Sequence, residues 1–428
     1  MSTPSCLAHS SSTSVTPAET SFRPLDSEDY RRAAAPAVFA ELAARGPIHH
    51  VVLPGEAPAW LVTRRAEAEA ALRDPRLTKD PLEVARYGQA VGRRRVPEDF
   101  TAVSGRQLMN LDGADHARIR RVITRYLVDS AVARKQTVLT ETVRHHVDAL
   151  AAEETADLVA DFAVPLVNDV IGRIIGVPPE LNEIIMTGGA LLFGPDDPTA
   201  PAMIDAYRQV TAAAGRAVAE GSTAEGADDL LGGLACAVRD GLVSRREAAS
   251  NLAMVMIAAT GGPVKMLAHS AVALHDDPLL RDAMLSGDPM AVVEDLLYQQ
   301  PPIPFTSWRF ATETMEIAGQ QVRAGDAVMV LIATANSEPA PPACPSGAPA
   351  APGERAPAER RPERNLAFGG GRHRCPGQSL ARRLAATALP ALFRAFPSVQ
   401  LQVPGTELIW RGGFGPRGPG RVPVRLRS

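Results

Sequence analysis

One cysteine of the chain lies in a stretch that is rich in glycine and arginine, LAFGGGRHRCPGQSLAR, from Leu366 to Arg382. The residues after Pro376 have a helical pattern, so Cys375 is expected just before a helix N-terminus. A thiolate that binds a metal as the sole protein ligand needs its negative charge stabilised. Backbone N–H groups of a glycine-rich loop and of a helix N-terminus can stabilise it. The stretch therefore predicts either a thiolate ligand or a structural turn around a buried cysteine.

A second stretch, LDGADHARIRR, carries a histidine and an arginine four residues apart, His116 and Arg120. One helical turn places both side chains on the same face, which suits two donors that converge on carboxylates. An ordinary solvated helix face is the alternative.

The ten residues FGGGRHRCPG resemble the heme-thiolate loop of bacterial cytochromes P450. The resemblance implies that Cys375 is the axial thiolate on the iron of heme b, iron protoporphyrin IX. It also implies that Phe368 packs on the proximal side of the heme and that His373 reaches a heme propionate. Gly377 completes the loop pattern as a further cofactor-binding position.

Two other stretches extend this resemblance, which covers nearly the whole chain from about Phe22 onward. LDGADHARIRR resembles the family's C-helix motif, which implies that His116 and Arg120 bind propionates. PPIPFTSWRFATE resembles the strand after the K helix, which implies the same role for Arg309. Together with His373, the resemblance thus supplies four propionate partners.

The longest helical pattern departs from the family at the positions that handle oxygen. The family carries an acid–alcohol pair that helps to deliver protons, and here the stretch is IAATGGPVKML. Gly261 falls at the acid position and Gly262 at the alcohol position, while Thr260 lies two residues early. Pro263 removes a helical hydrogen bond and predicts a kink, with an open groove that water or a substrate group could enter. The alternative is a protein that no longer activates oxygen.

A second departure concerns the Glu-x-x-Arg motif of the K helix. VVEDLLYQQPP carries Asp295 and Tyr298 at the two positions, so the arginine is absent. The meander that this arginine would brace is also altered, because the Pro/Ala-rich run after Glu338 replaces it. We expect a hydrogen bond from the Tyr298 hydroxyl to Asp295 as a neutral substitute.

The composition sets outer limits on function. The 428 residues are 45% hydrophobic and 22% charged with a net charge of −3, which does not favour nucleic acid or an anionic membrane as partner. Four cysteines without zinc or disulfide spacing indicate a reduced, cytoplasmic compartment. The apolar run Asn251–Thr260 is too short to span a bilayer.

The patterns along the chain predict a mainly α fold with a small β part. Residues 1–20 are expected to be a disordered tail, and residues 21–428 a single large domain. A long helix is predicted from Ser244 to His275 and a last helix from Ser379 to Phe396, with a β-hairpin near residues 48–64. The resemblance implies the cytochrome P450 fold, with heme between these two helices.

The resemblance also implies the function. We expect a heme-thiolate monooxygenase that acts on an apolar small molecule, an intermediate of secondary metabolism, with electrons from a ferredoxin and its reductase. Arg372, Arg374, Arg382 and Arg383 could receive this acidic partner or form a solvated face. Two alternatives are heme-thiolate chemistry other than monooxygenation (peroxide use, coupling or rearrangement) and a non-catalytic helper of a partner enzyme.

Overall fold

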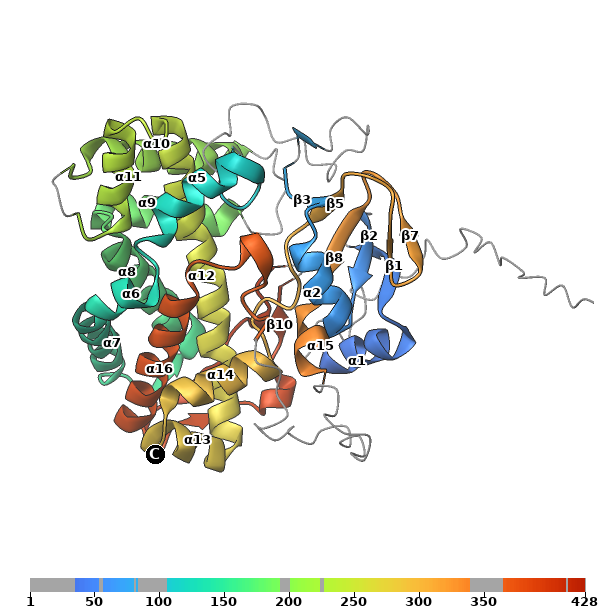
Figure 1. The fold of residues 1–428 in the computed structure, drawn as a ribbon. Helices are drawn as coiled ribbons and strands as arrows, with labels where there is room; N and C mark the ends of the chain where they lie inside the picture. The colour runs from blue at the N-terminus through green and yellow to red at the C-terminus, as the bar shows by residue number, and fades with distance from the viewer. Residues whose placement is uncertain are drawn as a thin grey trace, which may run out of the picture.

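The computed structural model describes residues 35–53, 57–80, 82–83, 106–192, 201–223, 227–338, 365–412 and 415–427. The tail expected at residues 1–20 and most of the Pro/Ala-rich run after Glu338 lie outside these ranges. The described residues form a large helical part beside a smaller β part (Figure 1).

The β part is built on a five-stranded sheet with a helix packed on each of its two faces. Apolar side chains are therefore needed on both faces of its strands. Its order is β1 (Ile48–Leu53), β2 (Ala57–Val62), β8 (Ala327–Val330), β5 (Arg309–Ala311) and β3 (Leu77–Thr78). Side chains alternate along β2, so Leu61 packs with α1 (Ala35–Arg45) and Val62 packs with α2 (Arg65–Arg73). The predicted hairpin is confirmed, with Ile48 opposite Val62.

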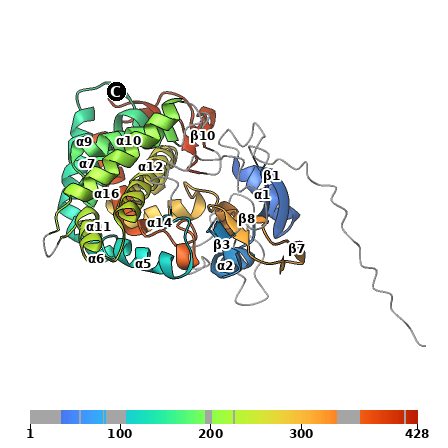
Figure 2. The ribbon, with the colours of Figure 1, turned by 90° about the horizontal axis from the view of Figure 1, so that it is seen from above.

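The helical part surrounds one long helix, α12 (Arg245–Asp276), which is seen nearly end-on in Figure 2. Ser244 and Glu247 form a capping box that fixes where α12 begins. The helix continues without interruption through Pro263. Its length and hydropathy would allow a membrane span, but 61% of its most apolar window is buried within the protein, which is typical of a core helix.

The remaining helices pack around α12 or cover the sheet. They are α5 (Gly113–Thr124), α6 (Asp129–Arg134), α7 (Gln136–Leu150), α8 (Val164–Ile175), α9 (Pro179–Leu192), α10 (Pro201–Glu220), α11 (Leu230–Arg239), α13 (Pro278–Ser286), α14 (Pro289–Gln299), α15 (Ile332–Ser337) and α16 (Gln378–Ala395), with one π-helix at Leu158–Ala163. The predicted last helix is therefore confirmed within one residue at each end.

Three smaller sheets complete the described fold. They are β4 (Thr155–Asp157) with β12 (Pro423–Arg425) and β9 (Gln400–Leu401), β6 (Met315–Ile317) with β7 (Gln320–Val322), and β10 (Trp410–Arg411) with β11 (Gly418–Pro419). β10 and β11 with the described residues between them, Gly412 and 415–417, are called the C-terminal hairpin below. The stretch MEIAGQQV, which has the pattern of one strand, is two, because Ala318 and Gly319 turn the chain with φ of 50° and 78°.

Candidate active site

The loop that carries Cys375 is shaped by its contact with the end of α2. Gly371 has φ of +63°, and a Cβ there would lie 2.2 Å from the carbonyl oxygen of Leu72. Gly369 also has a positive φ, +69°. The backbone N–H of Cys375 donates to the Phe368 carbonyl over 2.9 Å, which closes the loop just before α16 begins. The glycines are thus required by backbone geometry, as the loop pattern predicts.

The surroundings of Cys375 favour the protonated thiol in the protein alone. Burial raises the pKa of the Cys375 thiol, and this outweighs the backbone N–H of Gly377 and the positive charges of Arg120, Arg382 and Arg374. We had expected the loop and the helix N-terminus to stabilise a thiolate, but burial has the larger effect. A bound metal ion would displace the thiol proton outright.

Two charged side chains hold the proximal side of the loop in place. The Arg382 guanidinium lies over the Phe368 ring, 4.4 Å from its centroid. Its Nε and Nη2 donate to the Glu294 carboxylate over 2.6 and 3.2 Å, which joins α16 to α14. Arg382 thus fixes the position of Phe368 beside the loop.

Neutral amides brace the end of α14. The Asn336 side chain donates to the Tyr298 carbonyl over 3.0 Å and to Asn365 Oδ1 over 2.8 Å. Its own oxygen accepts from the Leu366 N–H over 2.8 Å. Burial raises the pKa of the Tyr298 hydroxyl, and the charged groups that face it are Arg65 and Glu338. The hydrogen bond expected between Tyr298 and Asp295 stays a prediction.

A buried carboxylate, Asp112, joins the cysteine loop to the start of α5. His373 Nε2 lies 2.8 Å from Asp112 Oδ1, and Arg372 Nε lies 2.5 Å from the same atom. The Lys79 backbone N–H donates to the other carboxylate oxygen over 2.6 Å. Burial opposes ionisation of Asp112, but these hydrogen bonds outweigh it and hold the pKa of Asp112 far below its usual range. An ionised carboxylate only accepts, so His373 Nε2 carries the proton.

Three further basic groups lie buried around Asp112. The His116 ring lies 4.3 Å from the His373 ring, and Arg309 is only 4% exposed. Within the described residues, His116 Nε2 and Arg309 Nη1 are buried and have no hydrogen-bond partner. Burial and the Arg309 charge lower the pKa of Lys79 to about 7, while burial and the Arg372 charge lower the pKa of Arg309 to about 10.

This donor set fits a heme, because in the described part of the chain more buried basic groups than acids lie around Asp112. Two propionates would give partners to His116 Nε2 and Arg309 Nη1 and would balance the excess positive charge. Arg120 lies on the side of the cluster nearer to the cysteine loop, where its Nη2 donates to the Arg374 carbonyl over 2.7 Å. The structure therefore brings together the residues that sequence predicts for the cofactor, His116, Arg120, Arg309, Phe368, His373, Cys375 and Gly377.

The predicted oxygen-handling residues lie on α12 and face different neighbours. The Thr260 hydroxyl donates back to the Ile257 carbonyl over 2.6 Å. A Cβ at Gly261 would lie 2.7 Å from Pro416 Cγ, so Pro416 fills the groove that we expected to be open there. A Cβ at Gly262 would lie 3.4 Å from Ile303 Cδ1.

Two other sequence-based expectations need correction. The sequence also predicts that Ile303, Pro304 and Phe305 line the far wall of the substrate site. This is wrong for Phe305, which is 1% exposed and packs edge-to-face on Phe39 in the core beside the sheet. Three of the four proximal arginines are paired with acids, Arg372 with Asp112, Arg382 with Glu294 and Arg383 with Asp129. These three are therefore not free positive charges.

Sequence reasoning missed Asp112 and Lys79. Asp112 stands at the N-cap position of α5, where aspartate is common for helix capping alone. Lys79 follows a two-residue strand in no recognisable motif. Neither residue type at its position signals a cofactor site, because only the fold brings them to the cysteine loop.

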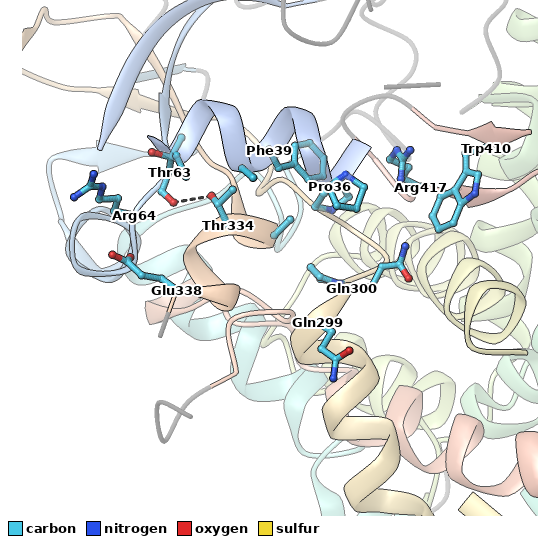
Figure 3. Close-up of a pocket in the computed structure, with 15 residues that line it drawn as sticks. Pro36, Phe39, Thr63, Arg64, Gln299, Gln300, Thr334, Glu338, Trp410 and Arg417 are labelled. Atoms are coloured by element: carbon cyan, nitrogen blue, oxygen red, sulfur yellow. Dashed lines mark hydrogen bonds between the residues drawn. The ribbon is translucent and has the colours of Figure 1, made fainter. Parts of the chain in front are cut away.

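A separate cavity of about 600 Å³ lies between α1, the end of α14 and the C-terminal hairpin. Figure 3 shows Trp410 and Arg417 at one end and Arg64 and Glu338 at the other. Its lining includes none of the predicted site residues.

The chain is similar to known proteins in both sequence and structure. Residues 290–408 match the family model for Cytochrome P450. The nocardicin C N-oxygenase of Nocardia uniformis is 30% identical over 90% of this chain and 94% of its own length. The cytochrome P450 monooxygenase PikC of Streptomyces venezuelae is 30% identical over 91% and 90%. The crystal structure of myxobacterial CYP267B1 with myristic acid has a TM-score of 0.81 at 28% identity, covering 94% of this chain and 98% of its own.

Proposed function

The chain belongs to the cytochrome P450 family, and from that membership we propose that Cys375 is the thiolate ligand of a heme b. The activity is that of a P450 monooxygenase of secondary metabolism, and it acts on a small molecule. The relatives are named as oxygenases, which does not favour peroxide use, coupling, rearrangement or a helper role. The orphaned His116 Nε2 and Arg309 Nη1 are the observation that carries the cofactor proposal.

Each residue of the cluster has a distinct role in this proposal. His116 and Arg309 bind the propionates, and Arg120 does so from the side of the cysteine loop. His373 donates its Nε2 proton to Asp112, so it binds a propionate only when Nδ1 is also protonated. Heme, when bound, supplies the oxygen chemistry, in which one atom of O2 enters the substrate and the other is reduced to water. Phe368 and the Gly377 N–H shield and stabilise the Cys375 sulfur.

The α12 residues have a limited part in proton supply. Gly261 and Gly262 carry no titratable group, and the proton of the Thr260 hydroxyl is held by the Ile257 carbonyl. Thr260 can therefore accept a hydrogen bond but is not oriented to donate one. The protons come from water or from a hydroxyl or carboxyl group of the substrate.

The substrate is proposed to be a largely apolar intermediate. Ala258, Gly262 and Ile303 present small or aliphatic groups on one side of α12. PikC is named a monooxygenase, and another relative is named 20-oxo-5-O-mycaminosyltylactone 23-monooxygenase. A lipophilic molecule of intermediate size would suit the apolar surface that Ala258, Gly262 and Ile303 form.

A ferredoxin and its reductase are the proposed electron donors, in a cytoplasmic setting. Since three proximal arginines are paired with acids, the exposed Arg121 and Arg125 near the end of α5 are the better contacts for an acidic protein. Reversing both charges should weaken ferredoxin-dependent reduction at low salt. The same change at Arg216 on α10 is the control.

The test uses the heme-loaded protein with ferredoxin, ferredoxin reductase and NADPH. We expect NADPH consumption that requires both O2 and the ferredoxin and that is lost in Cys375→Ser. Consumption that is equal in Cys375→Ser would overturn the proposal. Isotope-labelled O2 then identifies a true substrate by one labelled oxygen atom in its product.

A further inference from the structure

One face of α12 is occupied by the C-terminal hairpin. Ile257, Gly261 and Lys265 are four residues apart and therefore share that face. Lys265 Nζ donates to the Pro419 carbonyl over 2.9 Å, and a Cβ at Gly418 would lie 3.1 Å from Lys265 Cβ. The hairpin is thus held closely against the helix.

Pro416 meets this face at Gly261. A Cβ at Gly261 would lie 2.7 Å from Pro416 Cγ and 3.3 Å from Pro416 Cβ, which is closer than ordinary van der Waals contact. A space that cannot take a methyl group cannot take a water molecule either. Neither water nor an acid side chain fits between Gly261 and Pro416.

The neighbouring face of α12 is different. Successive helical residues are rotated by about 100°, so Gly262 points about 100° away from Gly261, while Ala258 lies one turn before Gly261 and shares its side of the helix. A Cβ at Gly262 would lie 3.4 Å from Ile303 Cδ1, and Ala258 is exposed although the helix before it is buried. Position 262, although buried, could therefore take a methyl group, whereas position 261 could not.

We propose that Pro416 is a positioning residue that takes the volume of a side chain at position 261 of α12, so that protons reach the reaction from water or from the substrate and not from an acid at this position. This inference rests on the proposed monooxygenase function. It explains why position 261, where the family resemblance expects an acid, is glycine here: Pro416 has taken the volume of the side chain.

The packing part of the proposal is tested by a double-mutant cycle on the heme-loaded protein. Gly261→Ala should shorten the half-life of the fold at a fixed high temperature by about 10-fold, because it overpacks the contact with Pro416. Adding Pro416→Gly should restore most of that loss. Gly262→Ala is the matched control, and Pro416→Gly should not restore any loss it causes. Additive effects of Gly261→Ala and Pro416→Gly would overturn the pairing.

The functional part is tested with variants that make space for an acid side chain at position 261. Pro416→Gly alone should raise the fraction of NADPH electrons lost as hydrogen peroxide by about two-fold or more, because water then enters. Gly261→Asp with Pro416→Gly should consume NADPH at least about 10-fold faster than the isosteric Gly261→Asn with Pro416→Gly. Equal rates for Asp and Asn, or unchanged peroxide release, would overturn the inference.

Failure of this inference is distinguishable from failure of the proposed function. A protein whose NADPH consumption does not depend on Cys375 contradicts the function, whatever the stability cycle gives. A protein with Cys375-dependent consumption but additive variants contradicts only the role of Pro416.

Discussion

Asp112 Oδ1 accepts a hydrogen bond from His373 Nε2 over 2.8 Å and so ties the start of α5 to the loop that carries Cys375. The same oxygen accepts from Arg372 Nε over 2.5 Å. Because the carboxylate accepts from both His373 and Arg372, Asp112 orients the His373 ring within the buried basic cluster. Burial lowers the pKa of His373 to about 4, in spite of the hydrogen bond to Asp112.

Replacement of Asp112 with Asn should weaken this junction. The amide keeps one acceptor but removes the negative charge, so we expect a loss of about 2–3 kcal/mol in the free energy of unfolding. Denaturant unfolding of the heme-loaded protein measures this loss. Asp115→Asn is the control, since Asp115 is exposed on the same helix and its pairs with Arg118 and Arg106 are worth less than about 1 kcal/mol. Equal losses for the two variants would contradict the role given to Asp112.

Arg309→Met should have opposite effects on the two forms of the protein. In the protein without heme, it removes a buried charge that has an orphaned Nη1, so we expect stabilisation by about 1–2 kcal/mol. In the heme-loaded protein it removes a propionate partner, so heme loss to an acceptor protein should be faster by about 10-fold. Unfolding with and without heme and the rate of heme transfer measure both. An effect of the same sign in both forms would argue against propionate binding.

The Glu294–Arg382 ion pair should stabilise the fold around the cysteine loop, and the effects of losing its two members should be coupled. Arg382 is bound to Glu294 through two nitrogens and lies over Phe368, so Glu294→Gln and Arg382→Met should each destabilise the protein. We expect a coupling energy of about 1–2 kcal/mol in the double-mutant cycle. Arg383 and Asp129, on a more exposed pair, provide the control cycle with a coupling below about 1 kcal/mol. Equal coupling in the two cycles would contradict this account.

His269 should make stability depend on pH. It is buried on α12, stacks on Trp410 with 6.4 Å between centroids, and faces the Arg417 charge. Burial lowers its pKa from 6.5 to about 3, so as pH falls the unfolded chain takes up the proton first. Its contribution to stability is full above pH 6.5 and is lost as pH falls toward 3, by up to about 1.4 kcal/mol per unit.

The measurement is the slope of unfolding free energy against pH between neutral and mildly acid conditions. His269→Phe should reduce this slope by the contribution of the single proton that His269 takes up on unfolding. A slope that is the same in His269→Phe and the unmodified protein would show that His269 is charged or hydrated in the fold.

Much of the fold and part of the site could be predicted from sequence. α12 and α16 have long apolar patterns, and the cysteine loop needs glycines whose positions show in the sequence. The contact of Pro416 with Gly261 could not be predicted, because it joins residues 155 positions apart through a hairpin with no motif. Likewise, the pairing of Arg382 with Glu294 depends on how α14 packs on α16. Local patterns predict elements, whereas tertiary packing decides which charges meet.

The central claim is that Cys375 is the thiolate ligand of a heme, and the absorption spectrum of the reduced protein with carbon monoxide tests it most directly. The account predicts a strongly red-shifted heme band in the unmodified protein and its loss in Cys375→Ser, which should keep the propionate partners and bind heme more weakly. A heme band without the red shift in the unmodified protein, or a red-shifted band that persists in Cys375→Ser, would contradict it.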